Sequence, residues 1–125
     1  MGRKIAYWAS TVIAAAMLLF ALSYLTGAPQ VVEGFNHLGY PQHLRLLLGI
    51  AKPAAAIVLL LPGLPLLKEW AYTGVAFAWL MAFIAHWQAG DGAEAFMPLV
   101  LLILLIVSYL TRPASRRLAL ATMPA

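Results

Sequence analysis

Hydrophobic residues gather into four long stretches along the chain, separated by short polar segments. The stretches cover residues 5–25, 44–61, 70–87 and 96–111. A helix needs about 17–25 residues to cross the roughly 30 Å hydrocarbon core of a bilayer, and each stretch is near that length. The pattern therefore predicts an all-α fold, in which a single transmembrane domain forms an integral membrane four-helix bundle.

The connections between these stretches carry residues that interrupt helices. Residues 26–43 hold five glycines or prolines, which predicts a loop. Residues 62–65 predict a tight turn, and the spacing of Asp91 and Glu94 matches a capping box at the start of the fourth helix. The first stretch exceeds the about 7–15 apolar residues of a signal-peptide core. We therefore expect it to be retained as a helix, with cleavage near Ala28 as the alternative.

The composition supports a membrane rather than an aqueous environment. Hydrophobic residues make up 64% of the 125 and charged residues 10%, against about 45–50% and 25% in soluble domains. A soluble chain of this size could not bury so much apolar surface. The lipid bilayer is therefore its expected partner. No cysteine is present, which excludes disulfides, thiol redox chemistry and cysteine-bound iron–sulfur clusters.

The basic residues predict an orientation. The net charge is +4, but these residues stand at the ends of apolar stretches, so we predict no nucleic-acid partner. Only Arg45 falls clearly on one side of the predicted membrane. On the other side lie Arg3, Lys4, Lys68, Arg112, Arg116 and Arg117. Because basic residues favour the cytoplasm, both termini are predicted there, with residues 112–125 as a short basic tail.

Lys52 lies near the middle of the second predicted helix. A charge at such depth costs about 2.5–3.5 kcal/mol on insertion scales, so it needs a carboxylate, a carbonyl or a ligand inside the bundle. An ion pair that locks helices together and a functional site both remain open. Helical spacing predicts that small or charged residues face inward and large aliphatic residues face lipid. The inward set is Arg45, Gly49, Lys52 and Ala56, and the lipid-facing set is Leu46, Ile50, Ile57 and Leu61.

The third predicted helix carries two neighbouring faces. Small residues permit close helix packing in membranes, whereas the aromatic face would fill the core and ends in a histidine. The small face holds Ala71, Gly74, Ala78, Ala82 and Ala85. The aromatic face holds Tyr72, Ala76, Trp79, Phe83 and His86.

Several polar residues of this region are candidates for a ligand site. His86, followed by Asp91 in the outer loop, is able to bond a quinone carbonyl, relay a proton or bind metal. The alternative interpretation is that the imidazole of His86 only bonds a backbone carbonyl or water and has no ligand. Glu69 is either a first-turn acid favoured by the helix dipole or the partner of a basic group. The candidate set is Lys52, His86, Glu69, Asp91, Tyr72 and Trp79.

No catalytic residues are predicted. The sequence has no nucleophile elbow, phosphate loop or paired catalytic carboxylates, so we expect no enzymatic activity from this chain alone. His37, His43, His86 and Asp91 all fall on the predicted outer side and could ligate a metal together. They show none of the recognised ligand spacings, so no metal site is predicted.

The chain resembles the DoxX-like family, small four-helix membrane proteins of the wider DoxX group. The segments that carry the resemblance are His37–Pro41, Leu48–Lys52, Pro62, Leu67–Gly74, His86, Gly90-Asp91, Pro98 and Ser108-Tyr109. The resemblance implies a multi-pass protein of the bacterial inner membrane. Within the wider group, some proteins are similar to subunits of quinone-linked oxidoreductases, including a thiosulfate:quinone oxidoreductase. Others resemble assembly factors, such as a chaperone of nicotinic receptors.

Three functions follow as hypotheses. The first is a quinone-associated or redox-accessory subunit, with quinone as cofactor and Lys52 or His86 donating to its carbonyl oxygen. The second is a non-enzymatic scaffold or assembly partner, whose small-residue face binds a membrane or redox protein. The third and weakest is a proton-coupled transporter, which would need to be a homo-oligomer and would titrate Lys52 and Glu69.

Overall fold

The computed structural model describes residues 1–117, and this part of the chain contains helices and no strand. The predicted all-α class is therefore confirmed. Residues 118–125 of the predicted tail lie outside the described residues. The elements are α1 (Gly2–Phe20), η1 (Ala21–Thr26), α2 (Pro29–His37), α3 (Gln42–Leu60), α4 (Pro65–Gln88), η2 (Gly92–Ala95), α5 (Phe96–Thr111) and η3 (Ala114–Arg116).

Three segments of the described chain are long and apolar enough to cross a membrane. They are residues 2–26, 42–60 and 92–111, which correspond to α1 with η1, α3, and η2 with α5. Helix α4 is the longest of all at 24 residues. It is not among these three segments, and it carries Lys68 and Glu69 near its start and His86 and Gln88 near its end. A fourth crossing by α4 stays a prediction.

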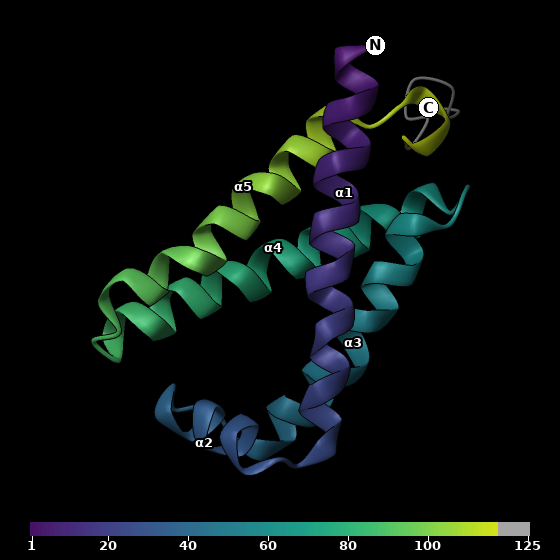
Figure 1. Cartoon of the computed structure of the whole chain (residues 1–125). Helices are drawn as coiled ribbons and strands as arrows, with labels where there is room; N and C mark the ends of the chain where they lie inside the picture. The colour runs from purple at the N-terminus through teal and green to yellow at the C-terminus, as the bar shows by residue number, and fades with distance from the viewer. Residues whose placement is uncertain (118–125) are drawn as a thin grey trace, which may run out of the picture.

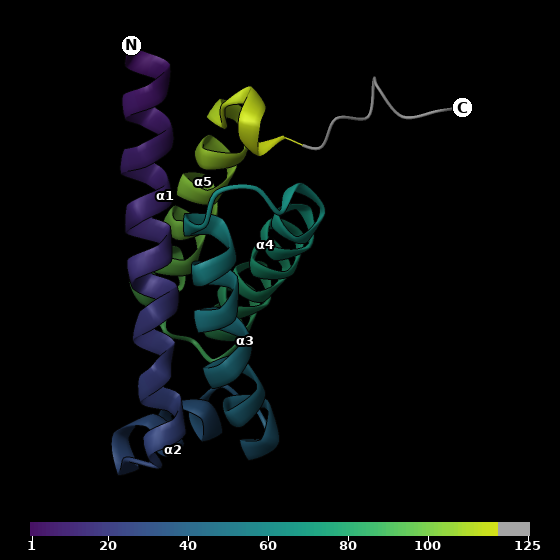
Figure 2. The same cartoon turned by 90° about the vertical axis from the view of Figure 1, so that its right-hand side faces the viewer.

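The long helices pack as a bundle in which α1 lies along one side. Helix α1 contacts both α5 and α3, while α4 packs beside α5 and against α3 (Figures 1 and 2). The core where they meet is formed by buried side chains that include Leu18, Leu59, Tyr72, Trp79 and Leu105. The faces predicted for α3 are confirmed, because Gly49 and Ala56 are buried whereas Ile50 and Ile57 are exposed.

A close approach between α3 and η1 depends on Gly49. A Cβ atom at this position would lie 2.7 Å from Cδ2 of Leu25 and 3.2 Å from Cβ of Tyr24. Glycine is the residue that admits such close packing of one backbone against another element. As a result, the ring of Tyr24 lies next to Lys52, whose Nζ is 5.3 Å from the ring centroid.

The segment 26–43 is not a continuous loop, which corrects the prediction. It contains α2, which starts with Pro29 in its first turn. Proline at that position favours a helix start, because its fixed φ suits the helix and its missing N–H is not needed there. Gly27 and Gly39, with φ of 70° and 79°, form the turns on either side. Phe35 of α2 is buried and packs against aromatic rings of the neighbouring segments.

Two buried cations cap the carboxyl end of α3. Its last carbonyls lack helical donors, and Pro62 removes one further N–H. Lys68 is only 2% exposed, and the side chain of Arg116 is also buried, over the ring of Trp8. Positive charge is favourable at this end of a helix dipole. The Nζ of Lys68 donates to the carbonyls of Val58, Leu61 and Gly63, and the guanidinium of Arg116 donates to those of Leu59, Leu60 and Leu61.

In the sequence, Lys68 and Arg116 are interpreted as basic residues that flank a helix and set its orientation. Their burial shows that they also cap α3, which the count of basic residues on each side does not reveal. Arg116 falls in the predicted short tail, yet it bonds the end of α3 and approaches the hydroxyl of Tyr7 at 3.3 Å. The start of that tail is therefore part of the packed bundle.

Candidate functional site

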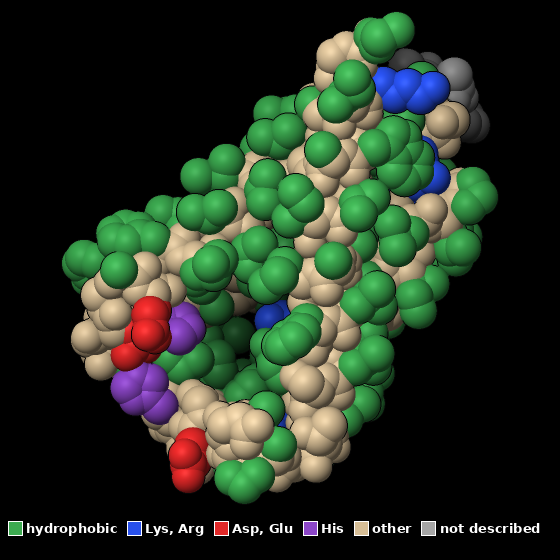
Figure 3. Space-filling model, viewed as in Figure 1, with side chains coloured by type: hydrophobic (Ala, Val, Ile, Leu, Met, Phe, Trp, Pro, Cys, Tyr) green, Lys and Arg blue, Asp and Glu red, His purple; other side chains and the backbone are tan. Residues whose placement is uncertain are grey.

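A partly open cavity of about 170 Å³ lies among η1, α2, α3, α4, the end of α1 and the start of α5. Its walls are mostly apolar and aromatic. Figure 3 shows a hollow in this region, with hydrophobic side chains around it, basic atoms at its edge, and histidine and acidic side chains nearby. The apolar walls include Met17, Phe20, Phe35, Leu48, Trp79 and Leu101.

Lys52 of α3 lines this cavity without a carboxylate partner. Within residues 1–117, no acidic side chain lies within 4.0 Å of its Nζ, and no hydrogen bond joins Nζ to another group. Its neighbour is the Tyr24 ring, at the distance of a cation–π contact. The structural ion pair considered from sequence is therefore not formed in the described part of the protein, and the ammonium is open to the cavity.

Tyr40, in the connection between α2 and α3, supplies a second uncommitted polar group. Its hydroxyl is buried and has no hydrogen-bond partner among the described residues, while its ring lines the cavity. Buried hydroxyls of this kind are normally bonded. Burial, and then the nearby Tyr24 phenol, raises the pKa of Tyr40 above its ordinary value. The hydroxyl therefore stays protonated and able to donate.

His86, in the last turn of α4, lines the cavity, and its imidazole is held by Asp91. Its Nδ1 lies 2.6 Å from one carboxylate oxygen of Asp91, and the other oxygen lies 2.5 Å from Nε2 of His37. The hydrogen bond with His37, and next that with His86, lowers the pKa of the Asp91 carboxyl. One carboxylate thus joins the end of α2 to the end of α4.

The capping box predicted at Asp91 is not formed. Its side chain makes no bond to the backbone of the following turn, and Gly92–Ala95 form the 3-10 helix η2 instead of opening α5 directly. The two histidines take both carboxylate oxygens, because tertiary packing brings them there from α2 and α4. The sequence spacing fits a capping box, but the two histidines compete with the backbone N–H groups for the Asp91 carboxylate.

Of the six candidate residues, the structure brings Lys52, His86 and Trp79 to the same cavity, with Asp91 behind His86. Glu69 and Tyr72 lie elsewhere. Glu69 bonds Arg112 at 3.0 Å and the hydroxyl of Tyr109 at 2.8 Å, so it has a basic partner that is not Lys52. The transporter hypothesis therefore lacks a direct pair between its two titrating groups.

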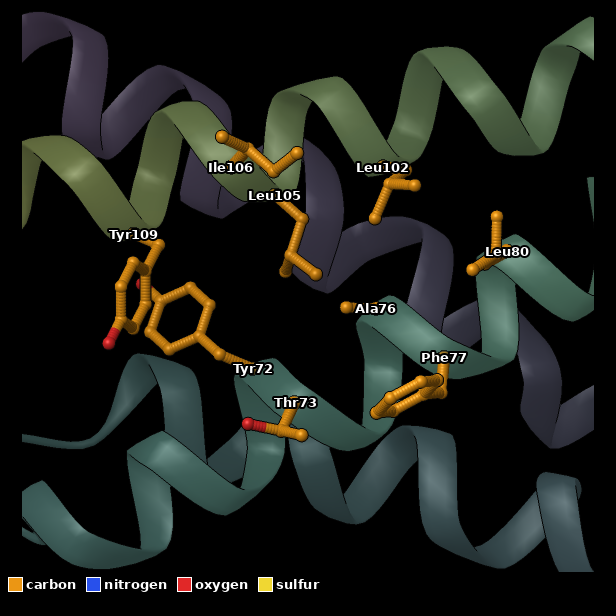
Figure 4. Close-up of a pocket in the computed structure, with 9 residues that line it drawn as sticks. All are labelled: Tyr72, Thr73, Ala76, Phe77, Leu80, Leu102, Leu105, Ile106 and Tyr109. Carbon is orange, nitrogen blue, oxygen red and sulfur yellow. The ribbon is translucent and has the colours of Figure 1, made fainter.

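Tyr72 belongs to a buried chain of hydroxyls that joins three helices. Its OH lies 2.7 Å from Oγ of Ser108, which lies 2.5 Å from Oγ1 of Thr11. The same tyrosine borders a groove of about 320 Å³ between α4 and α5, which Figure 4 shows with Leu80, Leu102 and Ile106. The groove's polar side chains are already bonded, because Thr73 donates to the carbonyl of Glu69 and Tyr109 to its carboxylate.

Sequence reasoning missed Tyr24 and Tyr40 as parts of the site. Tyrosines near the ends of apolar stretches are usually interfacial residues, so their type carried no specific signal. Tyr24 lies beside Lys52 through the close approach of η1 to α3, and Tyr40 reaches the cavity from the connection after α2, a helix that was not predicted. The one sequence signal for Tyr40 was its place in His37–Pro41, a segment that carries the family resemblance.

A helical bundle that turns leucine and isoleucine outward, along segments long enough to cross a bilayer, is a membrane protein. Residues 8–108 match the model of the DoxX-like family, and the chain belongs to that family. This confirms the resemblance seen in the sequence. No curated protein and no solved structure matches the chain significantly.

Proposed function

We propose that the cavity binds the head group of a lipophilic carbonyl compound of the quinone class, and that the protein serves as a quinone-associated or redox-accessory subunit. The observation that carries this proposal is the pair of uncommitted donors, Lys52 and Tyr40, beside one apolar cavity. Apolar walls with a few directed polar groups are typical of small-ligand sites.

The ligand would supply the hydrogen-bond acceptor that Lys52 lacks. An unpaired ammonium within a membrane span costs about 2.5–3.5 kcal/mol on insertion scales, and a carbonyl oxygen would accept a charge-assisted hydrogen bond from it. The hydroxyl of Tyr40 is a second donor, and the Trp79 ring offers an aromatic wall. His86 is a third polar group, oriented by Asp91.

The cavity volume suits a single ring. A cavity of about 150 Å³ is known to hold benzene, and this one is about 170 Å³. A second hollow of about 380 Å³ lies between α3 and α4 and shares Leu48, Lys52 and Ala78 with the cavity. The small residues Ala71 and Gly74 line it. A hydrocarbon tail would extend along this hollow, so the small-residue face would serve as its path.

The proposal includes the topology. The guanidinium of Arg3 bonds the carbonyl of Leu110, so the start of α1 and the end of α5 lie at the same end of the bundle. Four crossings, with α4 as one of them, would produce that arrangement. The basic residues at this end favour a cytoplasmic position for both termini in the inner membrane. The cavity would then lie toward the outer side, where α2 covers it.

The test is a titration of the detergent-purified protein with a short-chain quinone, followed by tryptophan fluorescence. We expect saturable quenching, since Trp79 lines the cavity. Lys52→Met should weaken binding about tenfold, which corresponds to the loss of one charge-assisted hydrogen bond. Lys4→Met is the matched control, because Lys4 is exposed on α1 and far from the cavity in sequence and fold. Absence of saturation, or equal affinity in wild type and Lys52→Met, would refute the proposal.

A second candidate function is that of a scaffold or assembly partner. It is favoured by Gly74, which is exposed, since a Cβ added there would meet no atom within 4 Å. The small-residue face is therefore open at this position and free to contact another protein. Gly74→Leu separates the candidates: loss of a co-purifying membrane protein with unchanged affinity for a long-tailed quinone would favour the scaffold. The reverse pattern would favour the tail path.

A further inference from the structure

Four side chains of the types that ligate metals lie near one another beside the cavity, three of them from residues 86–94 and one from α2. They are His37 at the end of α2, His86 at the end of α4, Asp91 in the turn that follows, and Glu94 in η2. We propose that this histidine–carboxylate cluster binds one divalent transition-metal ion of the zinc class. The cluster shares His86 with the cavity, but metal binding does not require a ligand in the cavity.

Three of the four ligands are compact enough for a single ion, and His37 joins them through its contact with Asp91. The ligating atoms of His86, Asp91 and Glu94 all lie within 4.8 Å of one another, and Nε2 of His37 lies 2.5 Å from Oδ1 of Asp91. In a tetrahedral zinc site, bonds of about 2.0–2.1 Å place the donors roughly 3.3 Å apart. Side-chain rotations would bring His86, Asp91 and Glu94 to that spacing, and Glu94 is exposed and free to make one.

The chemistry of the donors selects the class of ion. Two imidazoles with two carboxylates suit zinc and neighbouring transition metals, whereas calcium and magnesium prefer oxygen ligands alone. With neutral imidazoles, the two carboxylates balance the charge of a divalent ion. Glu94 has no ion-pair partner within residues 1–117, so its carboxylate is uncommitted.

The position of the cluster gives the ion a structural consequence. His37 belongs to α2, while the other three ligands belong to α4 and the turn into α5. Figure 3 shows the histidine and acidic side chains together at this corner of the molecule. A bound ion would fasten α2 across the outer side of the cavity more firmly than the hydrogen bond between His37 and Asp91 does alone.

The experiment uses the full-length protein in detergent, stripped of metal with a chelator. It is titrated with Zn²⁺ by calorimetry, with Mg²⁺ in parallel, and its thermal unfolding is recorded with and without each ion. We expect one Zn²⁺ per chain, stabilisation by Zn²⁺ and none by Mg²⁺. His37→Ala and Asp91→Asn should each weaken binding by about tenfold or more. His43→Ala is the control, because His43 is exposed at the start of α3 and outside the cluster.

Two results would overturn the proposal. One is the absence of saturable Zn²⁺ binding, which would make the cluster a hydrogen-bonded contact only. The other is binding that His37→Ala and Asp91→Asn leave unchanged. If these variants do not fold, X-ray absorption at the zinc edge of the wild-type protein decides: scattering from two imidazoles supports the site, and its absence rejects it.

Discussion

The capping of α3 by Lys68 permits a prediction with a magnitude. Lys68→Met keeps the length and apolar volume of the side chain and removes its three hydrogen bonds to carbonyls. The carbonyl of Leu61 retains a donor, since Nη1 of Arg116 lies 3.2 Å away. The carbonyls of Val58 and Gly63 have no other hydrogen-bond donor in the described part of the chain. For Val58 the reason is that residue 62 is proline and cannot close the next helical bond.

The cost follows from these two carbonyls. A buried acceptor that loses its partner costs about 1–3 kcal/mol, which gives roughly 2–6 kcal/mol for the pair. Water at the end of the bundle recovers part of this for Gly63, which lies in an exposed turn. We therefore expect Lys68→Met to lower the free energy of unfolding by about 2–4 kcal/mol.

The assay is reversible unfolding in mixed micelles, with SDS as denaturant and far-UV circular dichroism as the signal. Lys4→Met is the matched control, because Lys4 is exposed, and its effect should stay within about 0.5 kcal/mol. The double variant with Arg116→Met should be non-additive, since both cations bond the carbonyl of Leu61. A Lys68→Met protein as stable as the control would refute the capping argument.

Two further predictions test the packing and the buried polar chain by the same assay. Gly49→Ala should destabilise the protein by about 1–3 kcal/mol, because the new Cβ would meet Leu25. Gly74→Ala should be neutral or stabilising, since that position is open. Equal effects of the two substitutions would contradict the close approach of α3 to η1 at Gly49. Ser108→Ala should cost about 1–3 kcal/mol, because it strands the hydroxyls of Thr11 and Tyr72. Thr26→Ala, which removes an exposed hydroxyl, is the comparison. A similar loss of stability in that variant would contradict a special role of the buried hydroxyls.

The sequence was sufficient for the helical class and for the faces of α3, because apolar length and helical spacing are local properties. The inward position of Gly49 and the outward position of Ile50 follow directly from that spacing. Helix α2 was missed because its proline and glycines were interpreted as breakers, although Pro29 starts the helix and Gly27 and Gly39 bound it.

Partners of polar side chains were much harder to predict, since they depend on tertiary contacts. Lys52 was identified as a residue that needs explanation, but its neighbour Tyr24 comes from another element. Asp91 fitted a cap by spacing, yet His37, distant in sequence, takes one of its oxygens. Nothing in the order of residues indicates that Arg116 folds back onto the end of α3.

The contrast between Lys52 and Lys68 is the strongest physical argument for the proposed site at the cavity. Lys68 is the more buried of the pair, and carbonyls satisfy its ammonium at the end of α3. Lys52 stands in a span where an unpaired charge is costly, and among the described residues its ammonium has no hydrogen bond or ion pair and lies 5.3 Å from the centroid of the Tyr24 ring. The same bundle thus satisfies one lysine with its own backbone and leaves the other facing a cavity that also contains the unbonded hydroxyl of Tyr40. Stability alone would favour an apolar residue at position 52, and the proposed ligand would accept the hydrogen bond that the bundle does not offer Lys52.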